Sequence, residues 1–184
     1  MFVLGFYFRN ILFGFLQYII VRRKFLELYI SKEYLLRVLY FLGSNTKTNI
    51  KILSDICVTD FLASKYRFKI SYNLLSTFSN LRVFVQTFVK ENELVASVSG
   101  LYKSAGWAER EVWDLFGVYF LNHADLRRIL TDYGFHGFPF RKDFPLTGYV
   151  EIRYDEQRGD IVYEPVELTQ EMRFFNFSTG WEVD

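Results

Sequence analysis

The groups best suited to chemistry lie close together in the second half of the chain. Glu109, Glu111 and Asp114 fall within one short stretch, and His123 follows it. Carboxylates beside an imidazole could transfer protons or hold a metal ion. However, the spacing fits neither the HExxH pattern nor any Cys/His zinc pattern, so the sequence predicts no metal site.

Other chemistry finds even less support. Cys57, the single cysteine, and the serines have no neighbouring histidine and no G-x-S-x-G turn, so no nucleophile is predicted. The chain also lacks a phosphate-binding Walker loop and a GxGxxG fingerprint. A small stand-alone hydrolase that uses Glu109 and His123 remains as one alternative function.

The helix that must position these carboxylates is "GWAEREVWDLFG", bracketed by Gly106 and Gly117. At 100° per residue, Glu109 falls inside the apolar arc of this helix. A buried carboxylate needs a partner, which Arg127, Arg128 or Arg141 could supply as a bidentate fork. A catalytic carboxylate with a raised pKa is the alternative. The opposite, polar side of the helix carries Trp107, Arg110, Glu111 and Asp114.

Charged and aromatic residues continue after this helix in "DLRRILTDYGFHGFPFRKDFPLTGY", residues 125–149, which has no steady helical or strand period. Such a mixture is typical of a protein interface, where aromatic side chains anchor and charges set register. The domain's own surface is the alternative cover for these rings. The predicted charge pairs, within the chain or across an interface, involve Glu109, Arg110, Glu111, Asp114, His123, Asp125, Arg127, Arg128, Arg141, Lys142, Asp143, Glu164 and Glu167. The predicted interface aromatics are Phe140, Phe144, Tyr149, Phe174, Phe175 and Trp181.

The preceding part of the chain predicts a compact body. Residues 31–43 indicate a helix with Ser31 as a cap and Gly43 as a left-handed stop. Residues 49–58, 67–77 and 81–89 indicate strands, with a turn at 79–80, and a weak helical period runs through residues 92–102. The order predicts an α+β fold with helices on one face of a mainly antiparallel sheet. We therefore expect an N-terminal amphipathic helix in residues 1–30, an α+β domain in 31–120, and an extended, largely irregular C-terminal arm in 121–184.

The apolar N-terminal segment allows several interpretations. Arg9 and Asn10 interrupt it, which leaves runs too short for a bilayer span. A helix lying on a partner or on a membrane surface fits better. A span and a mitochondrial presequence are the remaining interpretations.

Composition narrows the class of protein. Hydrophobic residues at 51% and aromatics at 20% exclude a disordered chain. Residues 1–90 carry 13 Lys/Arg against 4 Asp/Glu, whereas the rest carries 9 against 17, so opposite charges favour matching within or between subunits over a nucleic-acid surface.

Three stretches, "EREVWDLFGVYF", "HADLRRILTDYGFHGFPFRKDFPLTGYVEIRYDE" and "EPVELTQEMRFF", closely resemble the 30 kDa subunit family of respiratory complex I, also called NADH dehydrogenase subunit 9. The likeness covers roughly residues 45–182. Related subunits occur in membrane hydrogenases and the chloroplast NADH dehydrogenase-like complex, which are alternatives within the family.

The resemblance implies a structural subunit in the hydrophilic arm of a proton-pumping NADH:ubiquinone oxidoreductase, on the matrix side of the mitochondrial inner membrane. It implies that the C-terminal arm lies against the large, 49 kDa-type quinone-site subunit. It also implies no catalytic residue and no cofactor in this chain, with the iron–sulfur clusters, FMN and ubiquinone held by partner subunits. The Phe- and Tyr-rich composition suits a gene in an AT-rich mitochondrial genome.

Overall fold

The computed structural model describes residues 2–173 and 175, and the chain divides into two compact units, residues 1–144 and 145–184. The first unit contains helices α1 (Phe2–Ile11), α2 (Leu35–Ser44) and α3 (Ala105–Phe116), and the 3-10 turn η1 (Lys32–Tyr34). Its main sheet is built from β1 (Leu16–Val21), β2 (Phe25–Ile30), β3 (Ile52–Asp60), β4 (Phe68–Ser76) and β5 (Leu81–Val89). The short strands β6 (Val95–Ala96) and β7 (Phe120–Leu121) pair separately.

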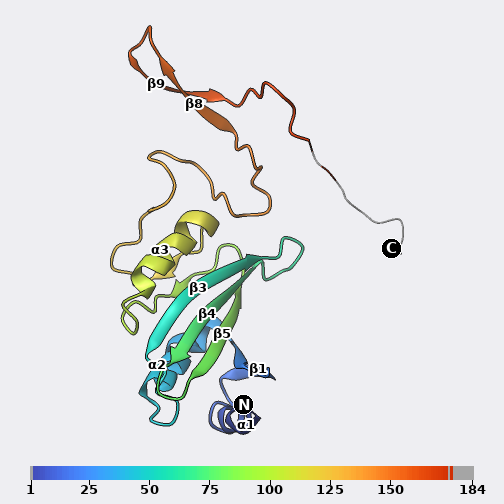
Figure 1. Cartoon of the computed structure of the whole chain (residues 1–184), viewed down its shortest axis with the longest axis vertical. Helices are drawn as coiled ribbons and strands as arrows, with labels where there is room; N and C mark the ends of the chain where they lie inside the picture. The colour runs from blue at the N-terminus through green and yellow to red at the C-terminus, as the bar shows by residue number, and fades with distance from the viewer. Residues whose placement is uncertain (1, 174, 176–184) are drawn as a thin grey trace, which may run out of the picture. The chain divides into compact units, whose positions relative to one another are not determined.

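The five strands lie in the order β1-β2-β5-β4-β3 (Figure 1). Neighbours are antiparallel except for β2 and β5, which run parallel. On β4, Phe68, Ile70, Tyr72 and Leu74 alternate with less buried residues, as the sequence predicts. These side chains share one core with α1, α2 and α3. The structure thus confirms the α+β class and its mainly antiparallel sheet.

The N-terminal helix is shorter than predicted. α1 ends at Ile11, and residues 16–30 form a hairpin of two strands, β1 and β2, which joins the sheet. A long apolar run fits a buried strand as well as a helix, and β-branched residues such as Ile19, Ile20 and Val21 favour the strand. No helix in the described part of the chain is long and apolar enough to cross a bilayer.

Three further local predictions fail. Residues 92–102 form β6 and turns rather than a helix. Gly43 lies inside α2, which continues to Ser44, and Ser31 makes no side-chain cap bond to the backbone. By contrast, Gly117 ends α3 in the left-handed conformation, and Asn80 adopts positive φ at the predicted β4–β5 turn.

After β7, residues 122–149 contain neither helix nor strand, as predicted for the start of the arm. The predicted arm starts at residue 121, whereas residues 121–144 cluster with the first unit. In the second unit, β8 (Val150–Asp155) and β9 (Asp160–Pro165) form an antiparallel hairpin that the sequence analysis missed.

Candidate functional site

Glu109 is fully buried on α3, but its partners are not the predicted arginines. Its carboxylate accepts hydrogen bonds from Ser97 Oγ and the Val98 backbone N–H, both at 2.6 Å. Burial raises the pKa of Glu109, while the bonds from Ser97 and Val98 and the nearby His123 act in the opposite direction. The carboxylate therefore fastens the 97–98 turn to α3.

His123 is engaged at both ring nitrogens. Its Nδ1 accepts the Asp125 backbone N–H at 3.1 Å, an arrangement that requires the proton on Nε2, which lies 3.1 Å from the Gly106 carbonyl oxygen. Glu109 Oε2 is 3.7 Å from the same nitrogen. Because Ser97 donates to Glu109 and not to His123, the three side chains do not form the relay that a Ser–His hydrolase needs.

Asp114 was predicted on the polar face of α3, yet it is fully buried. It accepts the backbone N–H groups of Ile129, Leu130 and Thr131 at 3.1, 2.6 and 2.9 Å, and the Thr131 hydroxyl at 2.6 Å. Arg128 Nη1 lies 3.4 Å from Asp114 Oδ1. Burial by itself would raise the pKa of Asp114, but these hydrogen bonds outweigh it and lower the pKa. One carboxylate thus orders the start of the irregular segment.

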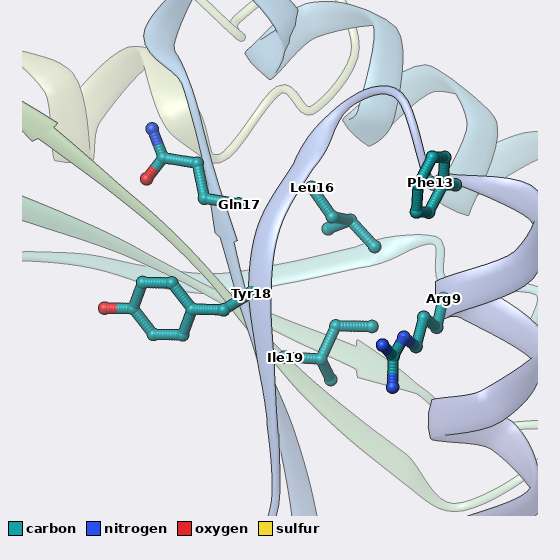
Figure 2. Close-up of a pocket in the computed structure, with 6 residues that line it drawn as sticks. All are labelled: Arg9, Phe13, Leu16, Gln17, Tyr18 and Ile19. Atoms are coloured by element: carbon teal, nitrogen blue, oxygen red, sulfur yellow. The ribbon is translucent and has the colours of Figure 1, made fainter.

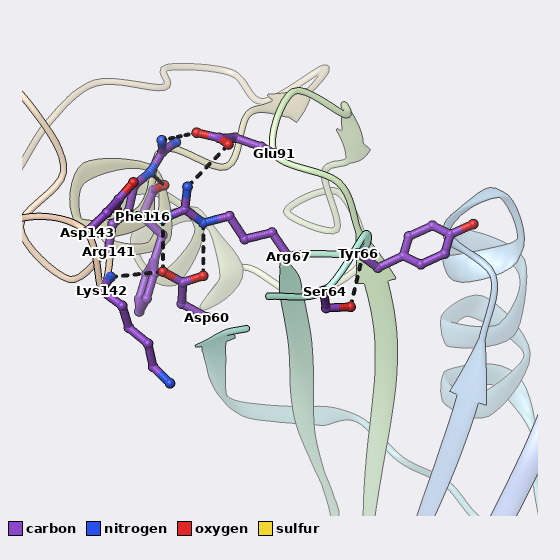
Figure 3. A network of polar contacts seen from close by, with 9 residues as sticks. All are labelled: Asp60, Ser64, Tyr66, Arg67, Glu91, Phe116, Arg141, Lys142 and Asp143. Atoms are coloured by element: carbon purple, nitrogen blue, oxygen red, sulfur yellow. Dashed lines mark hydrogen bonds and ion pairs between the residues drawn. The ribbon is translucent and has the colours of Figure 1, made fainter. Parts of the chain in front are cut away.

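A second network anchors the end of that segment to β3 and β4 (Figure 3). Arg67 holds Asp60 through Nε at 2.9 Å and Nη2 at 3.1 Å, and reaches Asp143 at 2.7 Å and Glu91 at 3.2 Å. The Lys142 backbone N–H donates to Asp60 at 2.9 Å. The hydrogen bonds that Arg67 donates to Asp60 and Asp143 raise the pKa of Arg67, and the bond to Asp143 lowers the pKa of Asp143. A fork shared among three carboxylates fixes position as well as charge.

Arg141 belongs to the same network. Its Nε donates to the Phe116 carbonyl at 2.7 Å, and its Nη1 contacts Glu91 at 2.6 Å. The guanidinium lies 4.5 Å from the Phe138 ring centre, and Phe138 packs edge-on against Trp113. Charged and aromatic side chains of residues 128–144 therefore contact their own domain. The sequence had left this open as the alternative to a contact with another subunit.

Gly117 is required by this packing. Its φ is +75°, and a Cβ would lie 2.6 Å from the Phe138 ring and 2.7 Å from Arg141 Nη2. We expect Gly117→Ala to lower the unfolding free energy by about 2–4 kcal/mol, from backbone strain and the forced shift of two side chains. Urea denaturation measures this. Gly106→Ala, in the same helix with open space around it, is the matched control and should not destabilise; equal stability of the two variants would contradict the prediction.

Low pH should weaken the ion pairs and hydrogen bonds made by Asp60, Asp114 and Asp143. Burial alone would raise the pKa of Asp60, but Arg67 and the Lys142 N–H together lower it, and the pKa of Asp114 and Asp143 is lowered as well. Carboxyls with a depressed folded pKa give stability above their unfolded pKa of about 3.9 and lose it as pH falls through the folded pKa. Glu109 acts with the opposite sign, since its raised pKa removes stability as pH rises.

We therefore expect the urea midpoint to fall steeply below about pH 4, and Asp60→Asn to flatten that slope. Glu164→Gln is the control, because the ion pair that Glu164 makes among the described residues is with the exposed Arg153, where solvent screens it. A slope changed equally by both variants would show that the buried network is not the cause.

The other predicted residues lie at the surface or in the second unit. Arg110 Nε donates to the Arg127 carbonyl, Asp125 pairs with Arg127 at 2.9 Å, and Glu164 pairs with Arg153 at 2.7 Å. Glu111 and Glu167 are exposed. Among the aromatics, Phe140, Tyr149 and Phe175 are exposed and Phe144 packs on Phe135. Phe174 and Trp181 lie outside the described residues.

Sequence reasoning missed the residues at the centre of the second network. Asp60 is the last residue of β3, and Arg67 directly precedes β4. Both side chains are buried although they are charged. An Asp and an Arg closing the same β-hairpin were the available signal. No cluster of three or more His, Cys, Asp or Glu that could hold a metal occurs in residues 2–173 and 175.

An α+β body holds a long irregular segment by buried ion pairs, and an exposed hairpin follows it. The chain belongs to the family described as respiratory-chain NADH dehydrogenase, 30 Kd subunit, whose model matches residues 28–150. The matched range begins before residue 45, where the sequence analysis placed the start of the likeness. The chain is thus a subunit of a respiratory oxidoreductase complex, as predicted.

Similar sequences and solved structures support the same family. The chain is 55% identical to NADH dehydrogenase [ubiquinone] iron-sulfur protein 3 of Oryza sativa subsp. japonica, over 84% of this chain and 81% of the relative. It is 56% identical to NADH-ubiquinone oxidoreductase subunit 9 of Reclinomonas americana, over 85% and 77%. The solved trypsin-resistant fragment of Nqo5 matches at 26% identity and a TM-score of 0.57, covering 68% of this chain and all of that one. A chain of an archaeal membrane-bound sulfane sulfur reductase shares the fold, with a TM-score of 0.64.

Proposed function

We propose that this chain is a structural and assembly subunit of the hydrophilic arm of a proton-translocating NADH:ubiquinone oxidoreductase. In this proposal it braces the large, 49 kDa-type quinone-site subunit while electrons pass from NADH to ubiquinone in neighbouring subunits. The names of its relatives, which mention NADH and ubiquinone, support the reaction. The location we propose is the matrix side of the mitochondrial inner membrane, with a mitochondrial gene.

The observation that carries the bracing role is the contrast between the two units. In the first unit, Asp114, Arg67 and Asp60 hold Arg128, Asp143 and the Lys142 backbone N–H, respectively. In the second unit, the β8–β9 hairpin exposes apolar side chains, and an isolated two-stranded hairpin is marginally stable in water. A partner surface that covers this hairpin supplies what it lacks, and we assign that surface to the large subunit.

We further propose that this chain holds no redox cofactor, although several relatives are named iron–sulfur proteins. An iron–sulfur cluster takes four cysteine thiolates, or two with two histidines, and Cys57 is the single cysteine. Partial desolvation and the neighbouring Asp55 carboxylate raise the pKa of the Cys57 thiol to about 11 although the residue is exposed, and this disfavours the thiolate that binds metals.

One native gel of mitochondrial membranes tests the function. We expect an antibody to this chain to label the high-mass band that also stains for NADH dehydrogenase activity. The purified chain is the control, since it should run at low mass and oxidise no NADH. If the antibody labelled this chain only at low mass in the membrane sample, the proposal would be wrong.

A further inference from the structure

Four segments meet at one end of the α+β domain, which we call the basic pole. They are α1, the β1–β2 turn at residues 22–24, the α2–β3 loop at 45–51, and the β4–β5 turn with the start of β5 at 77–82. Asn45 of the loop donates to Tyr7 Oη of α1 at 3.0 Å, and Ser79 Oγ donates to a carbonyl of the same loop at 3.4 Å. Gly5 of α1 packs directly against Val21, the last residue of β1, since a Cβ there would lie 2.7 Å from Val21 Cγ2. The four segments therefore form one continuous surface.

The basic pole carries seven exposed cations. They are Arg9, Arg22, Arg23, Lys24, Lys47, Lys51 and Arg82. No Asp or Glu occurs in residues 2–24, 45–51 or 77–82. Among the described residues, Arg22 is the one member of this set with an ion pair, which it makes with Glu27 at 3.2 Å. Such a concentration of cations without ion-pair partners attracts an anionic surface.

Exposed apolar side chains lie among these cations. Phe2, Phe6 and Phe78 are 80%, 68% and 77% exposed, and Val3 is 84% exposed. On α1, Phe2, Phe6 and Val3 share an arc of roughly 100° that points away from the core. Asn10 is the one polar side chain of this arc, and it carries no charge. Contiguous exposed apolar side chains mark interaction sites in soluble domains.

Cations lie at both margins of this arc. Arg9 projects roughly 20° beyond Phe2, on the side of α1 that faces β1, where it lines a pocket with Ile19 (Figure 2). At the other margin, Lys47 Nζ lies 4.7 Å from the centre of the Tyr7 ring. A helix that lies in a membrane interface has this pattern, because its apolar side chains enter the lipid while flanking cations reach the headgroups.

We propose that the basic pole binds the surface of an anionic phospholipid membrane, with the rings of Phe2, Phe6 and Phe78 entering the headgroup region. The distribution of charge favours lipid over protein. Seven cations on four segments meet a plane of mobile anionic headgroups whatever their spacing, whereas a polypeptide would need a carboxylate fixed opposite each one. A nucleic acid also offers phosphates, but its bases stack on rings and would leave the aliphatic Val3 uncovered.

The inference goes beyond the proposed function, because α1 and the β1–β2 turn lie before residue 28, where the family match begins. Flotation of the isolated full chain with vesicles tests it. We expect the chain to float with vesicles of equal parts phosphatidylglycerol and phosphatidylcholine, and at least roughly tenfold less with phosphatidylcholine alone.

Charge reversal at the β1–β2 turn tests the electrostatic part. Arg23→Glu combined with Lys24→Glu should lower binding to the anionic vesicles at least roughly tenfold, because each basic residue near an anionic surface adds to the attraction. Lys65→Glu combined with Lys103→Glu is the matched control. These two lysines are exposed outside the basic pole, and their reversal changes the net charge equally.

A second pair of variants tests insertion of the rings. Phe2→Ser combined with Phe6→Ser leaves the charge unchanged and should weaken binding to the anionic vesicles at least roughly fivefold, because two apolar side chains no longer enter the lipid. Phe61→Ser combined with Leu62→Ser is the matched control, since both residues are exposed between β3 and β4, outside the basic pole.

Four results would overturn the proposal. The first is no flotation with anionic vesicles, and the second is an equal loss of binding in a variant pair and its control. The third is tighter binding to a single-stranded RNA than to the vesicles at the same salt concentration, which would make the pole a nucleic-acid site. The fourth is protection of Phe6 from hydroxyl radicals in lipid-free complex, which would assign the pole to a neighbouring subunit. The native gel reads the proposed function separately, because vesicle binding by the isolated chain does not require the complex.

Discussion

Replacing Asp114 with alanine is expected to lower the unfolding free energy of the first unit by about 3–5 kcal/mol, the usual cost of removing one partner from a buried charged cluster. The reason is the number of hydrogen-bond donors that would lose their acceptor. Three backbone N–H groups, the Thr131 hydroxyl and Arg128 all point at this one carboxylate. Water cannot easily replace it, since Asp114 is 0% exposed.

Thermal and urea unfolding measure this loss, and two further variants assign its cause. Glu111→Ala changes an exposed carboxylate in the same helix and should leave stability nearly unchanged. Asp114→Asn keeps one acceptor oxygen but turns an NH2 group toward donors, so an intermediate loss is expected. If Asp114→Ala cost no more than Glu111→Ala, the segment would be held by something other than this carboxylate.

Much of the central fold could be predicted because its residues follow simple periods. The alternation in β4 and the left-handed glycine after α3 each reflect a local constraint that one sequence displays. The β1–β2 hairpin could not be separated from a helix, because its two strands are apolar at all but one position each. Its parallel pairing with β5 depends on contacts between distant residues, which periodicity does not encode.

The candidate site, too, could be predicted from the sequence only in part. A partner for Glu109 could be predicted from its place in the apolar arc, but the identity of that partner could not. Backbone N–H groups leave no mark in a sequence, and they hold both Glu109 and Asp114. The arginines that looked suited to Glu109 instead contact Asp114 in the case of Arg128 and Glu91 in the case of Arg141.

The largest effect on assembly is expected at the β8–β9 hairpin. Its register places Ile152 opposite Tyr163 and Tyr154 opposite Ile161 on one face, and all four side chains are more than half exposed. The other face carries the Arg153–Glu164 ion pair. Ile152→Asp should reduce the amount of assembled complex roughly tenfold or more, since losing a buried interface anchor costs about 2 kcal/mol or more.

The charged face of the same hairpin supplies the matched control. Arg153→Ala removes an exposed ion pair of small energetic value and should assemble nearly as the natural chain does. The melting temperature of the isolated chain should be the same for both variants, because the hairpin belongs to a compact unit separate from the α+β domain. Loss of assembly with unchanged melting then assigns the effect to a partner surface, whereas full assembly of Ile152→Asp would show that the apolar face is not the contact.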